Sequence, residues 1–273
     1  MVTFVFVHVQ KHIGLKKLLL LLLLCAPLIQ FAQNSLGNEP PADLVFFEYF
    51  QKEQYHEVVR SLSRNQDLNA NQQLLLFLSN QKIGNGQEAE IEEWIATHPD
   101  HPLNSLATFN YAQIQFAKGD TLTSKQSLAK IKPDELSQKD QATYGYLSGV
   151  ISLKDQQYSR ASRAFDLAAE KGYEDELELT YYQAFIAYHL SEYDKALVQF
   201  EKTKDRPPFD TSSKYYLARI YLESKEYEKV IELAQQELSE DVSLTSSGFY
   251  QLLGEAYAYQ EDLEKASALS RSS

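Results

Sequence analysis

Apolar residues recur at intervals of three and four between residues 249 and 266. This spacing places Tyr250 and Leu253 on one face of a helix, and Leu263 and Ala266 on one face of a second helix. The polar residues between them predict a turn that joins two short antiparallel helices. Each helix is only half apolar, so the pair needs neighbours that cover its apolar face. The segment therefore predicts one unit of a repeated structure.

The same pattern returns along the chain. A small or β-branched residue, here called the anchor, follows each predicted turn, and successive anchors lie 31 to 37 residues apart. The residue twelve places before the anchor, here called the packing position, is glycine or alanine in the last five units, which lets a neighbouring helix approach closely. The anchors are Val58, Ala89, Ser124, Ala161, Ala196, Val230 and Ala266, and the packing positions are Phe46, Phe77, Ala112, Gly149, Ala184, Ala218 and Gly254.

This pattern resembles the tetratricopeptide repeat (TPR), a helix-turn-helix unit of 34 residues, over about residues 43–273. The resemblance is strong in the last four units and partial around residues 109–131. It is weak in the first two units, where bulky Phe46 and Phe77 occupy the packing position. The resemblance implies an all-α fold, a right-handed α-solenoid or superhelix of about seven units. No strand pattern or second domain is evident after residue 43.

Residues 1–33 have the character of a secretory signal peptide. Lys16 and Lys17 precede the leucine run of residues 18–24, and Ala32 is a small residue suited to cleavage. The run is shorter than the roughly 20 residues of a membrane span, although an uncleaved anchor stays an alternative. Lipid attachment at Cys25 is disfavoured because leucines precede it. We expect residues 34–42 to form a linker and the protein to be exported, to the periplasm or outer membrane of a Gram-negative bacterium.

Charge and composition narrow the possible partners. The chain carries 38 acidic and 26 basic side chains, a formal charge of −12. Such a surface repels phosphate groups, which argues against binding of nucleic acid or of an anionic membrane surface. The only cysteine lies in the leader, so the exported domain is expected to be stable without disulfides.

The sequence offers no constellation of catalytic or metal-binding residues. His98, Asp100 and His101 lie in a proline-bounded turn without further nearby ligands, and a helix-terminating loop explains them better than a metal site. His56 and His189 are isolated. We therefore predict that the protein is not an enzyme and binds no metal, cofactor or small-molecule substrate.

The resemblance also implies a binding groove. In TPR arrays the first helices line a concave surface, through the residue after the packing position and those three before and four after it. Seven of the fifteen corresponding residues are aromatic, and aromatic side chains suit the docking of an extended or helical peptide. Only one of them is basic, so the clamp that some TPR proteins use for a C-terminal carboxylate is absent. The predicted groove residues are Phe109, Gln113, Phe116, Tyr146, Val150, Leu153, Tyr181, Phe185, Tyr188, Tyr215, Arg219, Leu222, Gln251, Glu255 and Ala258.

The sequence thus favours a non-catalytic scaffold of the bacterial cell envelope that docks a peptide or helix of a protein partner. Two alternatives stay open. The chain stops at Ser273 within the last unit and without a polar capping helix, as expected of the N-terminal sensor segment of a longer signalling protein or peptidase. A helical-repeat carbohydrate-active enzyme would need convergent carboxylates, and only Glu178 and Glu255 lie near the predicted groove.

Overall fold

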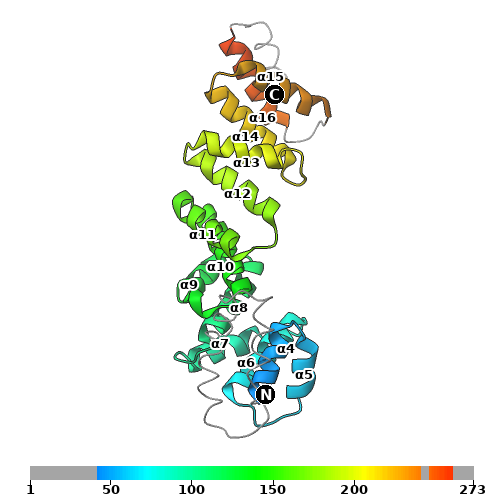
Figure 1. Ribbon diagram of the computed structural model, residues 1–273, viewed down its shortest axis with the longest axis vertical. Coiled ribbons are helices and arrows are strands. Elements are labelled where there is room, and N and C mark those ends of the chain that lie inside the picture. Colours follow the sequence, from blue (N-terminus) through cyan, green and yellow to red (C-terminus); the bar gives the residue numbers. More distant parts are fainter. Residues whose placement is uncertain (1–41, 241–245, 261–273) are drawn as a thin grey trace, which may run out of the picture. The chain divides into compact units, whose positions relative to one another are not determined.

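The computed structural model describes residues 42–240 and 246–260, and the predicted leader and the second helix of the last repeat lie outside these residues. Within them, helices are the only regular secondary structure. The chain divides into an N-terminal unit, residues 1–144, and a C-terminal unit, residues 145–273. The α-helices, labelled in Figure 1, are α4 (Ala42–Gln51), α5 (Tyr55–Leu62), α6 (Ala70–Lys82), α7 (Glu88–Thr97), α8 (Asn104–Ala117), α9 (Thr121–Leu128), α10 (Gln138–Lys154), α11 (Tyr158–Lys171), α12 (Glu176–His189), α13 (Tyr193–Thr203), α14 (Asp210–Glu223), α15 (Tyr227–Glu240) and α16 (Ser246–Tyr259). A short 3-10 helix, η1 (Pro133–Glu135), lies between α9 and α10.

The helices pair in the order that the repeat predicts. Six helix-turn-helix hairpins, from α4–α5 to α14–α15, are followed by the first helix of a further unit, α16, within the described residues. Alanine at the packing position is fully buried in three units, and four anchors in addition to Val58 have no exposed surface. The all-α helical-repeat prediction is confirmed. The buried alanines are Ala112, Ala184 and Ala218, and the buried anchors are Val58, Ser124, Ala161, Ala196 and Val230.

A left-handed residue marks the turn of each of the six described hairpins, five places before the buried residue of the second helix. In the C-terminal unit these residues are Gln156, Ser191 and Lys225, with φ between 56° and 61°. The amide of the next residue donates to the carbonyl five positions earlier, as from Glu192 to Ala187 at 2.8 Å. This bond ends the first helix with the geometry of a Schellman motif. In the N-terminal unit Glu53 and Gly119 have the same geometry. In the hairpin of α6 and α7 the corresponding bond follows Gly84, from the Asn85 amide to the Asn80 carbonyl at 2.9 Å, and the left-handed residue five places before the buried Ile91 is Gly86.

The second repeat corrects the predicted register. Ala89 is exposed, and Ile91 is the fully buried residue of α7. On α6, Ser79 is fully buried, whereas Phe77 is half-buried. The turn before α7 contains two left-handed glycines, at 84 and 86, so α7 starts two residues later than the anchor at Ala89 assumes. With this correction Val58, Ile91 and Ser124 are each separated by 33 residues.

Two buried serine hydroxyls of the N-terminal unit, those of Ser79 and Ser124, have no hydrogen-bond partner among residues 42–144, the part of this unit that the structure describes. We expect Ser124→Ala to raise the free energy of unfolding by about 1 kcal/mol, because an unsatisfied buried hydroxyl costs about 1–3 kcal/mol. Ser213→Ala is the matched control, since its buried hydroxyl lies 2.7 Å from that of Thr203 and the substitution breaks this bond. Urea unfolding should show opposite signs, and a loss of stability for both variants would contradict the prediction.

The left-handed turns give a second test. Ser191 is exposed and has φ of 59°, a conformation that an L-residue adopts at a cost of about 1–2 kcal/mol and that glycine adopts freely. Ser191→Gly should therefore leave the free energy of unfolding unchanged or raise it by up to about 1 kcal/mol. The same substitution at the exposed helical residue Ser159 should lower it by about 0.5 kcal/mol. Equal losses in thermal or urea unfolding would argue against a strained turn.

Candidate functional site

The predicted aromatic row is largely occupied by contacts between hairpins of the C-terminal unit. On α12, Tyr181 stacks on Phe209 with ring centroids 4.6 Å apart, and Tyr188 lies 5.0 Å from Tyr216. Phe185 meets Tyr216 edge-on at 5.4 Å. Burial raises the pKa of Tyr216 to about 12 and also raises that of Tyr181. These half-buried rings pack α12 against the following hairpin and leave only part of their surface for a partner.

Two predicted groove residues belong to the core. Phe109 is fully buried, and its ring lies 6.5 Å from that of Tyr144. Leu222 is 9% exposed and packs in the cluster around Ala218 and Phe249. Both side chains are apolar and lie on helix faces that turn toward a neighbouring helix. The assignment of these two residues to an open groove is therefore corrected.

The other predicted groove residues are half-buried or exposed. Tyr146 stacks on Tyr173 at 4.4 Å, and its hydroxyl donates to Glu178 at 2.8 Å. The pKa of Arg219 is raised by its hydrogen bond to Tyr188. Gln113 lies in the N-terminal unit and lines a different surface, described next. The remaining residues are Phe116, Val150, Leu153, Tyr215, Gln251, Glu255 and Ala258.

The N-terminal unit contains a large hollow of about 1140 Å³. Its walls come from α4, α6, α8, η1 and the start of α10, four of which are first helices of hairpins or their beginnings. One part of the wall is apolar, with Leu44, Phe47 and Phe50 of α4, Leu103 directly before α8 and Leu106 within it. Another part carries amides and a hydroxyl, from Asn71, Asn110, Gln113 and Thr143.

Of the predicted groove residues, Gln113 alone lines this hollow. The stripe of α8 that lines it runs through Leu103, Leu106, Asn110 and Gln113, at intervals of three and four. This periodicity is visible in the sequence and could have identified the lining face of α8. The residue two places before the packing position Ala112, rather than three, faces the hollow.

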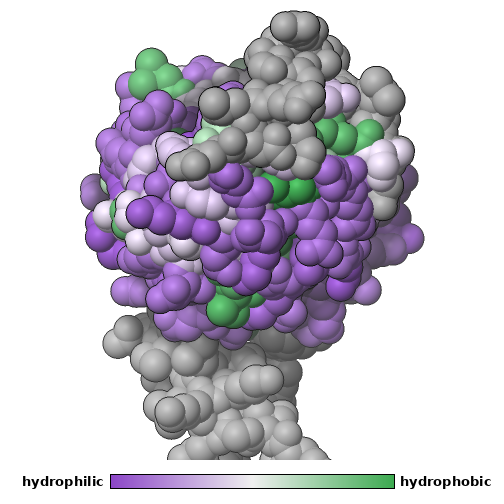
Figure 2. Space-filling model, turned by 90° about the horizontal axis from the view of Figure 1, so that it is seen from above, coloured by the Kyte–Doolittle hydropathy of each residue, from purple (hydrophilic) through white to green (hydrophobic). Residues whose placement is uncertain are grey.

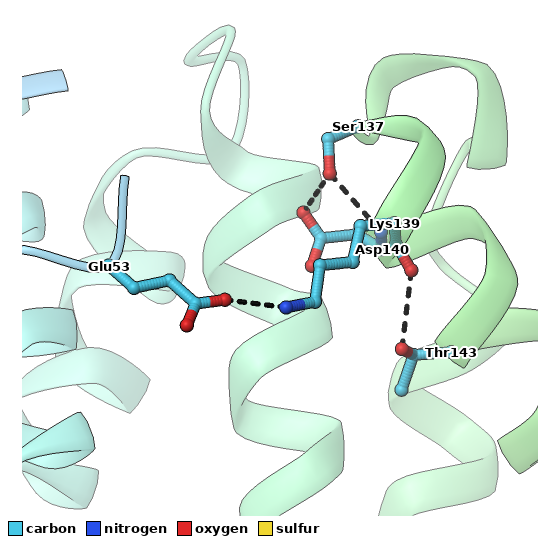
Figure 3. A network of polar contacts seen from close by, with 5 residues as sticks. All are labelled: Glu53, Ser137, Lys139, Asp140 and Thr143. Atoms are coloured by element: carbon cyan, nitrogen blue, oxygen red, sulfur yellow. Dashed lines mark hydrogen bonds and ion pairs between the residues drawn. The ribbon is translucent and has the colours of Figure 1, made fainter. Parts of the chain in front are cut away.

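Charged groups gather where α10 begins (Figure 3). Lys139 donates to Glu53 at 2.5 Å, a contact between residues 86 positions apart in the sequence. This hydrogen bond lowers the pKa of Glu53. Ser137 donates to Asp140 at 2.6 Å and accepts a hydrogen bond from its backbone amide at 3.1 Å. The network fixes the first turn of α10 beside the turn between α4 and α5.

Lys82 and Asp140 both line the hollow, and burial against its walls shifts the pKa of each side chain. Lys82 keeps part of its surface exposed to solvent. The walls of the hollow remove some of the water around its ammonium group, and this desolvation lowers the pKa of Lys82. The same desolvation raises the pKa of the half-buried Asp140 carboxyl. Each effect disfavours the charged form, and the opposite charge of the other residue counteracts it. An occupant with polar groups would therefore meet both signs of charge.

At the N-terminus of α6, the carboxylate of Asp43 accepts hydrogen bonds from three amide side chains. Asp43 of α4 accepts hydrogen bonds from Asn69 at 3.0 Å, Gln72 at 2.8 Å and Asn71 at 3.3 Å. Asn69 also caps α6 through its side chain. These bonds fix the distance between α4 and α6 and so fix the width of the hollow at this side.

His98 and His101 cover a tryptophan. The His98 ring stacks on Trp94 at 4.6 Å, and His101 meets it edge-on at 5.0 Å. His101 accepts a hydrogen bond from the Leu103 amide at 3.1 Å. Among residues 42–240 and 246–260, no cluster of three or more His, Cys, Asp or Glu side chains could hold a metal ion.

Among the described residues, the large hydrophobic side chains that are exposed belong to Leu122, Val198 and Tyr259. Figure 2 shows a face on which hydrophilic residues predominate and hydrophobic ones form small separate spots. None of the helices that the structure describes has the length and apolar character needed to cross a membrane.

Comparison with solved structures places the fold in the TPR class. The chain is similar to the crystal structure of YrrB, described as a TPR protein with an unusual peptide-binding site, with a TM-score of 0.51 and 17% identity over 64% of this chain and 87% of YrrB. A tetratricopeptide repeat protein from Parabacteroides merdae aligns with a TM-score of 0.41 and 16% identity, over 83% of this chain and 88% of that protein. No protein-family profile matches the chain, and a sequence search of curated proteins finds no match.

Proposed function

We propose that this protein is a non-catalytic scaffold that binds a peptide segment of a partner protein, and that the hollow of the N-terminal unit is the binding site. The observation that carries the proposal is the hollow itself. Its volume of about 1140 Å³ exceeds the upper end of the usual range for small-molecule pockets, roughly 1,000 Å³. Its wall combines apolar side chains with amides, and a peptide presents both kinds of group. The TPR-like fold supports the proposal, and YrrB is described as having a peptide-binding site.

The test is selection from a phage-displayed library of random 12-residue peptides with the full-length chain. We expect enriched peptides whose binding is lost in Gln113→Trp, because the indole would occupy the hollow. Gln126→Trp is the matched control, since Gln126 is exposed on α9 and outside the hollow. Binding that survives Gln113→Trp would move the site elsewhere, for example to the aromatic row of α12. No enrichment would contradict peptide binding.

We further propose that the scaffold works in the cell envelope of a Gram-negative bacterium. The support is the pattern of residues 1–33, with Lys16 and Lys17 before the leucine run. Alkaline phosphatase is active only after export. A fusion of residues 1–33 to this enzyme should therefore show phosphatase activity in cells, and Leu21→Arg should abolish that activity. An inactive fusion that is nevertheless produced in full would contradict the proposal.

A further inference from the structure

The turn between α6 and α7 carries an asparagine followed directly by a glycine, Asn85 and Gly86. This dipeptide occurs once in the chain. Both residues are exposed and lie outside the helices, after α6 ends at Lys82 and before α7 begins at Glu88. Glycine suits the second place because its backbone is left-handed here, with φ of 59°. The hydrogen bonds of the helices therefore do not hold the backbone of this pair, and solvent reaches it.

The two groups that can react with each other in this pair are accessible. Within residues 42–240 and 246–260, the backbone N–H of Gly86 donates no hydrogen bond. A Cβ placed on Gly86 would meet no heavy atom within 4 Å apart from those of its chain neighbours, so open space surrounds the residue. The Asn85 side chain makes one exposed hydrogen bond, from its Nδ2 to Oδ1 of Asn80 at 3.0 Å. The Gly86 nitrogen can therefore approach the side-chain carbonyl carbon of Asn85.

Two asparagines of α8 lack this freedom. Asn104 donates through its Nδ2 to the carbonyls of Ile95 and His98, at 3.3 and 2.9 Å. Asn110 is 5% exposed and lies inside the helix, where the N–H of the next residue is bonded to a carbonyl of the preceding turn. At both positions the surrounding structure opposes an approach of side chain and main chain that the turn at Asn85 permits.

The reaction that this geometry allows is loss of ammonia from the side chain. The Gly86 nitrogen gives up its proton to a base and attacks Cγ of Asn85, and Nδ2 leaves as ammonia. The product is a five-membered succinimide ring. Water then adds to one of the two ring carbonyls and breaks the bond from that carbonyl to the Gly86 nitrogen. The overall change consumes one water, releases one ammonia and involves no oxidation or reduction.

We infer that Asn85 is a site of spontaneous modification by water, which converts it to aspartate and isoaspartate and adds a negative charge to the turn after α6. Opening of the ring at Cγ gives aspartate. Opening at the main-chain carbonyl gives isoaspartate, in which the chain continues through the former side chain. The new carboxyl group is ionised at neutral pH, as carboxyl groups in contact with water are. The reaction needs no partner, so it is independent of peptide binding.

The modified turn directly follows a wall of the hollow. Lys82, which lines the hollow, lies three residues before Asn85. A carboxylate in this turn opposes the positive charge of Lys82, so the modification makes this side of the hollow more acidic. Isoaspartate also lengthens the main chain by one carbon atom. The amide of Gln87 donates to Oε1 of Gln81 across the turn at 2.7 Å, and the added carbon changes the spacing of these two residues.

The test follows the full-length protein in mildly alkaline buffer by mass spectrometry of its tryptic peptides. Alkaline buffer favours the reaction because the attacking nitrogen must lose its proton. Trypsin releases residues 83–118 as one peptide, which contains three asparagines. We expect progressive replacement of the amide by a carboxyl group at Asn85, located by fragmentation, while Asn104 and Asn110 keep their amides. Protein isoaspartate methyltransferase should label the aged protein in the same peptide.

Asn85→Gln is the matched control. It keeps a side-chain amide, but the extra methylene disfavours ring closure, so the peptide of this variant should stay unmodified; circular dichroism checks that the variant is folded. Protein unfolded in guanidinium chloride shows how fast the pair reacts without structure. Conversion of the unfolded chain with an intact Asn85 in the folded protein would overturn the inference. Equal conversion of Asn104 and Asn110 in the folded protein would also overturn it, because the exposed turn would then give no selectivity.

Discussion

Replacing Gly145 by alanine is expected to lower the free energy of unfolding by about 3 kcal/mol, the upper part of the range for overpacked cores. A Cβ at this position of α10 would lie 2.7 Å from the carbonyl oxygen of Ala164 and 2.7 Å from the amide nitrogen of Ala168, both on the backbone of α11. Backbone atoms cannot rotate away, so the two helices must separate and lose close packing.

Gly149→Ala is the matched control for Gly145→Ala. Its added Cβ would meet the ring of Phe165 at 2.8 Å, and a side chain can shift where a helix backbone cannot. We expect a smaller loss, about 1 kcal/mol. Urea unfolding of both variants measures the difference. Equal losses, or a stable Gly145→Ala protein, would show that α10 and α11 are not in this close contact.

The second large effect is expected at a buried ion pair. Lys214 of α14 and Glu237 of α15 lie 2.6 Å apart with side chains only 14% and 11% exposed. Lys214→Met should cost about 3–5 kcal/mol of unfolding free energy, because it leaves a carboxylate buried without its cation. The double variant Lys214→Met, Glu237→Leu should be more stable than Lys214→Met alone, since an apolar pair of similar volume replaces both charges.

The exposed pair Lys195–Glu192, at 3.4 Å, is the control for the buried one. Lys195→Met should change the free energy of unfolding by less than about 1 kcal/mol, as is usual for surface ion pairs. A double-mutant cycle measured by urea unfolding gives the coupling within each pair. Similar coupling energies for both pairs would mean that water reaches Lys214 and Glu237.

The sequence predicted the repeat because packing positions depend on local spacing. Ala184 and Ala196 lie twelve residues apart on the two helices of one hairpin, and both are fully buried as predicted. The register failed in the second repeat, where Ala89 matched the pattern of small anchors but Ile91 is buried. The lengthened turn with Gly84 and Gly86 changed the spacing, and a single sequence gives no separate measure of turn length.

The candidate site was less predictable than the fold. Tyr181 and Tyr188 lie on the predicted face of α12, but their rings are largely used against the neighbouring hairpin. Whether an aromatic ring contacts a neighbouring helix or solvent depends on the rotation of each helix about its axis, which residue spacing leaves open by tens of degrees. The hollow brings together Glu53 and Lys139, which are 86 residues apart, and no local pattern relates them.

The single tryptophan gives the molecule an intrinsic optical probe of one of its two units. Trp94 is buried in the N-terminal unit, and it is the only indole in a chain with eighteen tyrosines. Its fluorescence, excited where tyrosine does not absorb, reports the loss of packing around α7, while far-ultraviolet circular dichroism reports all helices together. Coincident unfolding curves would show that both units unfold cooperatively, and separate midpoints would show that the array unfolds in stages, as repeat proteins can.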